Sequence, residues 1–256
     1  MGTEGRMDAP TAEALLKPNE RLDDLQRSGL RIIQEPSGNR FSTDAVLLSS
    51  YCAAKSRDRV ADLGTGTGIL PLLIWAKWRP EKITGVEIDP ETADMASRSV
   101  LVNNLEESIA IVNADLKDAP SLLGKAKFTL VVSNPPYIRA GEGMQGISEK
   151  RALARHEIGC TMDDVAKAAA ALLVPRGRFA LVHRPDRLCD IMVALRASGL
   201  EPKAMRMVHN TAGDVPSMVL ITAVKGASRG LKMSSPLIVY DEQGKYTAET
   251  EAIYFG

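Results

Sequence analysis

The sequence predicts an α/β fold with a mostly parallel sheet, helices on both of its faces and an antiparallel hairpin near the C-terminus. Downstream of Arg59, apolar strand-like runs alternate with helix-like segments, which is the pattern of a parallel sheet. A glycine-rich turn at 62–68 lies where the first of these strands passes into a helix. A second turn, at 133–137, follows the fourth strand and contains two successive prolines, which fix the backbone and remove N–H donors. These two turns are the candidate ligand-binding positions.

The individual elements follow from the same alternation. Strands are expected at 60–63, 83–87, 110–112, 128–132 and 177–182, with helices at 69–77, 90–104, near Ser121, and at 162–174. A further helix at 187–198 ends at Gly199, and strands at 204–209 and 217–224 form the antiparallel hairpin. Together these give a sheet of seven strands.

The two ends of the chain are expected to be attachments to this sheet. Residues 1–41 form an N-terminal extension in which strands at 31–34 and 40–41 pair as a β-hairpin around the turn signal at 36–39. Residues 42–256 form the main domain, which begins with a helix capped by Ser42 or Thr43 and carrying Asp44 in its first turn. The main domain ends in a tail with a strand at 237–240 and a short helix that finishes at Phe255.

Bulk composition excludes several classes of protein. The charges balance at 32 basic and 32 acidic residues, so a nucleic-acid partner must be held by a local basic patch. Three separated cysteines and three scattered histidines lack the spacing of a disulfide framework or a metal site, so we expect a reducing compartment and no metal. No apolar run is long enough to cross a bilayer, and no signal-peptide core is present, so we expect a cytoplasmic protein.

The glycine-rich turn predicts a nucleotide or nucleoside site. Gly64, Gly66 and Gly68 are spaced GxGxG and not GxGxxG, which argues against a dinucleotide. Glu87 ends the next strand, where a carboxylate can accept hydrogen bonds from ribose hydroxyls, and Asp115 follows the third, where it can accept from an adenine amino group. Each carboxylate alone is as easily explained as a solvated loop or a helix cap. Three successive strand ends with these groups indicate one nucleoside-shaped crevice.

The proline-rich turn predicts a reaction at an amino nitrogen. The lone pair of a conjugated NH₂ group is delocalised, so an enzyme must hold both hydrogens to turn that lone pair toward an electrophile. Asn134 Oδ1 and the Pro135 carbonyl can accept the two hydrogens, Pro136 keeps them placed, and Tyr137 offers a face for stacking a planar target. The alternative is a turn that merely ends a strand with two prolines.

These motifs together resemble the class I S-adenosylmethionine-dependent methyltransferases that act on amino nitrogens. The runs at 40–48, 154–157, 183–187 and 240–247 more narrowly resemble the bacterial tRNA(Val) adenine-37 N6-methyltransferase family. The resemblance implies a Rossmann-like fold, S-adenosyl-L-methionine as methyl donor with S-adenosyl-L-homocysteine as product, and tRNA as substrate. It implies that the cofactor is bound by Thr43, Asp44, Asp62, Gly64, Thr65, Gly66, Gly68, Glu87, Ile88, Ala114, Asp115 and Asn134.

Basic residues on both sides of the predicted crevice suggest where RNA would bind. Arg139 and Arg155 follow the proline-rich turn, and Arg184 follows the fifth strand, so they can form a rim around a flipped adenine. Each is equally well explained as a solvated loop residue. Two other functions remain open: a glutamine N5-methyltransferase acting on release factors, whose substrate also presents an amide NH₂, and a non-catalytic cofactor- or RNA-binding module.

Overall fold

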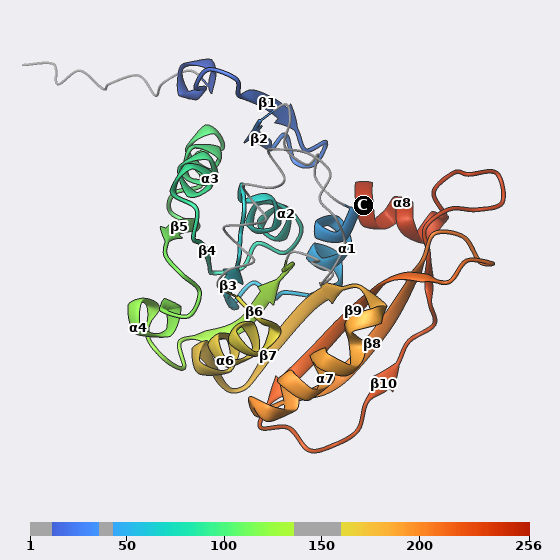
Figure 1. Ribbon diagram of the computed structural model, residues 1–256. Helices are drawn as coiled ribbons and strands as arrows, with labels where there is room; N and C mark the ends of the chain where they lie inside the picture. Colours follow the sequence, from blue (N-terminus) through green and yellow to red (C-terminus); the bar gives the residue numbers. More distant parts are fainter. Residues whose placement is uncertain (1–11, 36–42, 136–159) are drawn as a thin grey trace, which may run out of the picture.

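The computed structural model describes residues 12–35, 43–135 and 160–256, which are coloured in Figure 1. Their central feature is a nine-stranded sheet in the order β10-β8-β9-β7-β6-β3-β4-β5, with β11 also paired to β8. The strands are β3 (Arg59–Leu63), β4 (Lys82–Glu87), β5 (Ile109–Asn113), β6 (Phe128–Ser133), β7 (Leu173–His183), β8 (Leu200–His209), β9 (Pro216–Lys225), β10 (Lys232–Met233) and β11 (Leu237–Ile238).

The seven long strands confirm the predicted sheet. Strands β3 to β7 pair in parallel, whereas β9 is antiparallel to both β7 and β8, so the C-terminal hairpin inserts β9 between them. The two-residue strands β10 and β11 were not expected as sheet members and lengthen the edge at β8. The predicted strand at 237–240 is correspondingly shorter, and β7 begins at Leu173, where a helix had been expected.

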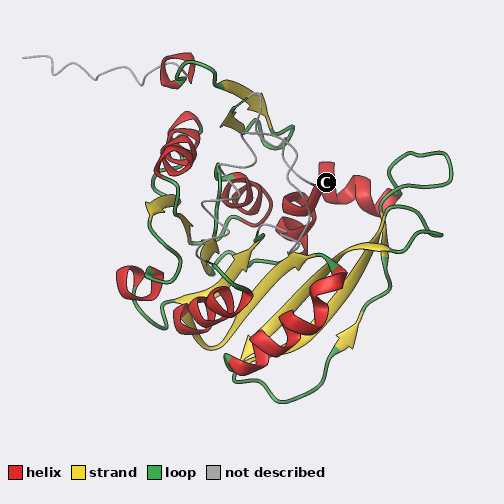
Figure 2. Ribbon diagram, viewed as in Figure 1, coloured by secondary structure: helices red, strands yellow, loops and turns green. Residues whose placement is uncertain are grey.

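Helices cover both faces of the sheet, as predicted (Figure 2). One face packs against α1 (Thr43–Tyr51), α2 (Ile69–Trp78) and α3 (Pro90–Val102), and the other packs against α4 (Ala119–Leu123), α6 (Met162–Leu172) and α7 (Leu188–Ala197). Neighbouring strand residues divide between the two cores because side chains alternate along a strand: Val60 joins the first and Ala61 the second. Burial on both faces explains the nearly continuous apolar strands of the sequence.

The N-terminal hairpin differs from the prediction. Residues 31–34 form β2 (Arg31–Gln34), but its antiparallel partner is β1 (Arg21–Asp24). The expected partner at 40–41 lies outside the described residues, as does the predicted domain boundary at 41–42. A strand made of Arg21, Leu22, Asp23 and Asp24 has low intrinsic β propensity, so only the pairing with apolar β2 reveals it.

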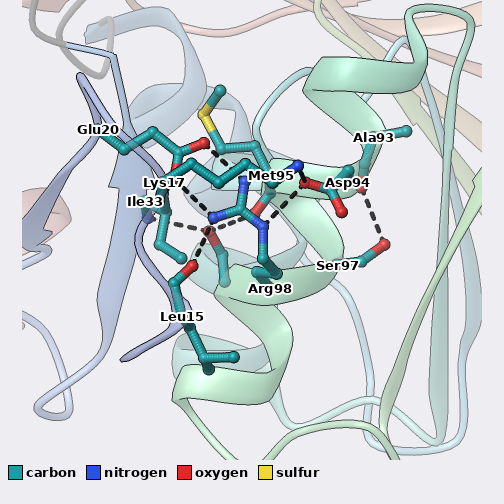
Figure 3. A network of polar contacts seen from close by, with 10 residues as sticks. Leu15, Lys17, Glu20, Ile33, Ala93, Asp94, Met95, Ser97 and Arg98 are labelled. Carbon is teal, nitrogen blue, oxygen red and sulfur yellow. Dashed lines mark hydrogen bonds and ion pairs between the residues drawn. The ribbon is translucent and has the colours of Figure 1, made fainter. Parts of the chain in front are cut away.

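Polar contacts fix this hairpin and the preceding 3₁₀ turn (Ala12–Leu15) onto α3 (Figure 3). Arg98 donates to both carboxylate oxygens of Glu20 at 2.6 Å each and to the Leu15 carbonyl, while its Nε reaches Asp94 at 2.9 Å. The Ile33 amide donates to the Ser99 hydroxyl at 2.9 Å. The guanidinium and the Glu20 carboxylate are almost buried, so this bidentate pair orients the extension against the sheet domain.

The C-terminal helix α8 (Ala248–Phe255) returns to the start of the main domain (Figure 1). Tyr254 packs with the first turn of α1, and burial raises its pKa to about 12. Arg206 holds Glu249 through two hydrogen bonds of 2.7 and 2.8 Å, and Arg27 donates to the Ile253 carbonyl at 2.7 Å. No helix in the described part of the chain is long and apolar enough to span a membrane.

Candidate functional site

Four neighbouring parallel strands bring the predicted site residues to one edge of the sheet. The carboxyl ends of β6, β3, β4 and β5 lie side by side in that order. They carry, respectively, Asn134, the glycine turn, Glu87 and Asp115. Residues that are far apart in the sequence therefore line a single edge, which is the usual location of ligands in open α/β sheets.

The glycine turn joins β3 to the N-terminus of α2. Gly64, Gly66 and Gly68 have φ of +77°, +57° and +87°, a backbone region that residues with a side chain rarely adopt. A Cβ added at Gly64 or Gly66 would meet no atom of the described residues within 4 Å, so neither glycine is packed against that part of the chain. A Cβ at Gly68 would lie 3.2 Å from that of Ala96, so this glycine instead allows α2 and α3 to pack. Two glycines thus leave room for a ligand, and the third has a packing role.

Asp62 is a buried carboxylate at the base of this turn. Its side chain is fully buried, and neither oxygen has a hydrogen-bond partner among the described residues. Burial raises the pKa of Asp62 to about 7 and the negative charge of Glu87 raises it further, while the nearby Thr65 hydroxyl, which makes no hydrogen bond of standard geometry, lowers it. An unpaired buried carboxylate is costly unless a cation reaches it. The position is suited to a positively charged part of a ligand.

Glu87 is held in place by the two turns around it. Its Oε2 accepts from the Gly66 amide and its Oε1 accepts from the Asp89 amide, each at 2.9 Å. The side chain is buried. A carboxylate oxygen can accept more than one hydrogen bond, so a carboxylate held in this way is suited to a pair of hydroxyls. Glu87 therefore links the glycine turn to the next strand end in a fixed geometry.

The end of β5 forms the third part of the edge. Asn113 donates to the carbonyls of Glu87 and Ile88 at 2.9 and 3.0 Å, and the Ala114 amide donates to the Glu87 carbonyl at 2.9 Å. These bonds leave the Ile88 side chain exposed beside Ala114. Asp115 pairs with Lys117 at 3.1 Å, so its carboxylate is already occupied in part.

Ser133 and Asn134 connect the proline-rich turn to the glycine turn. In the β3–β6 register Asp62 lies opposite Val132, so the positions that follow, Leu63 and Ser133, are also neighbours. The buried Ser133 hydroxyl donates to the Leu63 carbonyl at 2.8 Å. Ser133 and Leu63 are thus joined at the ends of β6 and β3. Asn134 follows Ser133 directly, and Gly64 follows Leu63 directly. The strand ends that lead into the two turns are therefore adjacent.

Comparisons with known proteins identify the family. The model of the methyltransferase small domain matches residues 37–186. The chain belongs to this methyltransferase family. A Porphyromonas gingivalis protein named tRNA1(Val) (adenine(37)-N6)-methyltransferase is 29% identical over 228 residues, covering 84% of this chain and 88% of the relative. A protein of the same name from Aeromonas salmonicida is 29% identical over 210 residues, covering 81% and 85%.

Solved structures agree with the family assignment. A predicted O-methyltransferase from Agrobacterium tumefaciens has a TM-score of 0.67 at 26% identity, covering 83% of this chain and 95% of that chain. A Pyrococcus horikoshii protein, TYW2, solved in complex with MeSAdo, has a TM-score of 0.59 at 15% identity, covering 82% and 73%, and shares the fold. The Rossmann-like class I methyltransferase fold implied by the sequence is thereby confirmed.

The remaining predicted site residues of this methyltransferase fall into two groups. Thr43 and Asp44 form the first turn of α1, and Arg184 follows β7 with its amide donating to His183 Nδ1 at 2.8 Å. The side chain of Thr65 is buried against Gly85, so only its backbone can face a ligand. The residues of the second group lie outside the described residues: Pro136, Tyr137, Arg139 and Arg155.

The sequence alone indicated no role for two residues that hold this edge of the sheet together. Asn113 fixes the loops after β4 and β5, and Ser133 joins β6 to β3. Their signal is weak, since each is a polar residue at the end of an apolar strand. Within the described residues, the three cysteines are free and no group of three acidic, histidine or cysteine side chains is arranged to hold a metal ion.

Proposed function

We propose that this methyltransferase transfers a methyl group from S-adenosylmethionine to the exocyclic N6 of an adenine in tRNA, namely adenine 37 of tRNA(Val). The names of the relatives, which align over most of their own length, support the substrate. A tRNA-modifying activity of this kind belongs in the cytoplasm. We place the transferase unit in residues 42–256 and regard residues 1–41 as an extension.

The observation that carries the proposal is the bond between Ser133 and Leu63. This bond joins the end of β6 to the residue before Gly64, and Asn134 follows Ser133 directly in the sequence. An acceptor for an amino group and a ligand-binding turn thereby share one edge. The arrangement supports transfer to nitrogen because a donor bound at the glycine turn would lie near the group that Asn134 holds.

The residues at this edge fit S-adenosylmethionine. The unpaired Asp62 carboxylate suits the ammonium group of the cofactor, and Glu87 suits its ribose hydroxyls. The space at Gly64 and Gly66 admits its methionine portion. Ile88 and Ala114 offer apolar surface for the adenine ring. When bound, the cofactor supplies an electrophilic methyl group on a sulfonium.

The protein's own contribution is to orient the target nitrogen. Asn134 Oδ1 and the Pro135 carbonyl accept the two N–H hydrogens, which turns the nitrogen lone pair out of conjugation. Preorganised acceptors of this kind stabilise the charge that develops on the amino group during attack. One proton then leaves to solvent, because the alkylated nitrogen is acidic, and no general base is required.

The test is incubation of the protein with labelled S-adenosylmethionine and either tRNA(Val) lacking the modification or a release factor. We expect N6-methyladenosine at position 37 after nuclease digestion and mass spectrometry. A tRNA(Val) variant with guanine at position 37 is the matched control and should accept no label. Labelling of the release factor alone would reassign the enzyme to glutamine, and cofactor binding without labelling of either would indicate a binding module.

A further inference from the structure

The edge of the sheet opposite the candidate site is positively charged. The strands β3, β6 and β7 run in parallel and are neighbours, so their amino ends meet there. Six exposed cations lie near these amino ends, five of them at or just before β3 and β6 and the last, Arg176, in the first half of β7. We call them the amino-edge basic surface: Lys55, Arg57, Arg59, Lys125, Lys127 and Arg176. The Arg59 amide donates to the Thr129 hydroxyl at 3.0 Å, and Lys127 is two residues before Thr129, so Arg59 and Lys127 lie near each other on neighbouring strands.

No carboxylate neutralises these cations within the described part of the chain. None of the six forms an ion pair there. The acidic residue among them, Asp58, is buried and bonded to Arg178 at 2.7 Å, with Thr129 at 2.8 Å on its other oxygen. Among the described residues, the exposed acids named along the same edge lie toward β4 and β5, at Glu81, Glu106 and Glu107. The surface therefore gathers positive charge on a chain whose formal net charge is zero.

We propose that the amino-edge basic surface binds the phosphate backbone of the RNA substrate, away from the nucleotide that is methylated. This inference rests on the proposed function, which supplies the RNA. Side-by-side cations without partners repel one another, and a polyanion is the ligand that relieves this repulsion. Exposed lysines and arginines suit phosphate contacts, which position a nucleic acid without reading its sequence.

The distance between the two edges agrees with a large substrate. β6 contains six residues, so its ends are about 20 Å apart at roughly 3.3 Å per residue. The body of a folded tRNA continues beyond the anticodon arm, so whole tRNA offers more backbone phosphate to this distant edge than the isolated stem-loop does. The surface should therefore distinguish whole tRNA from its isolated anticodon stem-loop.

The experiment compares two double variants in RNA binding, by fluorescence anisotropy over a series of salt concentrations. Arg59→Gln with Lys127→Gln removes two charges from the amino-edge basic surface. Lys167→Gln with Lys232→Gln is the matched control, since it removes the same charge from exposed positions on α6 and β10. We expect the edge variant to bind whole tRNA about tenfold more weakly, with a salt slope lowered by about 1.4, and to bind the stem-loop as the wild type does.

The outcomes separate this inference from the proposed function. Affinity for whole tRNA equal to that of the control variant, in a protein that still methylates tRNA, overturns the amino-edge surface alone. Equal loss of affinity for the stem-loop also overturns it, since the effect would then be non-specific charge. Failure of the wild type to methylate tRNA overturns the proposed function, whatever the binding data show. Unchanged melting temperatures, expected for exposed residues, exclude misfolding as the cause.

Discussion

The two edges of the central sheet use charge in opposite ways. At the carboxyl edge, the acidic groups Asp62 and Glu87 are buried, and Glu87 is fixed by two backbone amides. At the amino edge, cations such as Arg57 and Arg59 are exposed and have no ion-pair partners among the described residues. Buried groups are held in one geometry, so they can select a small ligand by shape. Exposed cations are not held in one geometry and cannot select a ligand by shape, so they are suited to a long polyanion.

The largest effect expected at the carboxyl edge comes from Asn134→Ala. Loss of one preorganised acceptor should lower kcat by about 100- to 1,000-fold while the affinity for S-adenosylmethionine stays near that of the wild type. Single-turnover kinetics and a calorimetric cofactor titration measure the two quantities. Asn210→Ala, in the exposed turn after β8, is the control and should leave both unchanged. A parallel loss of cofactor affinity would assign Asn134 to cofactor binding instead of to the orientation of the target nitrogen.

The pH dependence of cofactor binding tests the buried charge of Asp62. With a pKa near 7, raised by burial, the carboxylate forms as pH rises, so cofactor affinity should increase about tenfold from pH 6 to pH 8. Asp62→Asn should bind more weakly at pH 8 and show no such increase. Calorimetry at several pH values makes the measurement, and a pH dependence that persists in the variant would exclude Asp62 as its source.

The same group predicts an opposite trend in stability. The folded-state pKa of Asp62 lies above the ordinary value of an aspartate, 3.8, so the unfolded chain gives up its proton first as pH rises. The ligand-free wild type should therefore lose stability between about pH 4 and pH 7, at up to about 1.4 kcal/mol per pH unit from this group. Asp62→Asn should lack that component in denaturant titrations. The buried Asp62 carboxylate therefore lowers the stability of the ligand-free protein but provides a site that a cation can occupy.

The sequence predicts the sheet and the backbone of the site because both depend on local signals. The glycines at 64, 66 and 68 indicate a turn with positive φ, and the apolar runs indicate strands, each from the local sequence alone. The pairing of β1 with β2 was missed because charged Arg21–Asp24 becomes a strand only through its partner. The Ser133–Leu63 bond depends on the register between strands 70 residues apart, which periodicity does not specify. The burial that raises the pKa of Asp62 is likewise a tertiary property.

A smaller effect is expected from the bond that joins the two turns. Ser133→Ala removes a buried hydrogen bond and leaves the Leu63 carbonyl without that donor, which should cost about 1 kcal/mol of unfolding free energy. If Ser133 positions Asn134, kcat should also fall while the KM for cofactor changes little. Ser121→Ala, at an exposed position in α4, is the control for loss of a hydroxyl. A stability loss with kcat unchanged would limit Ser133 to a structural role.

The smallest effect concerns an exposed ion pair at the carboxyl edge, that of Asp115 with Lys117. Lys117→Met frees an oxygen of Asp115 that a ligand's amino group could then use, so cofactor affinity should rise, by no more than about threefold because an exposed pair is weak. Calorimetry in low and high salt measures it, and salt should reduce the difference between variant and wild type. If Lys117→Met lowers the affinity for the cofactor instead, the lysine itself contacts the cofactor. The carboxyl edge would then bind its ligand through an exposed cation, as proposed for the amino edge.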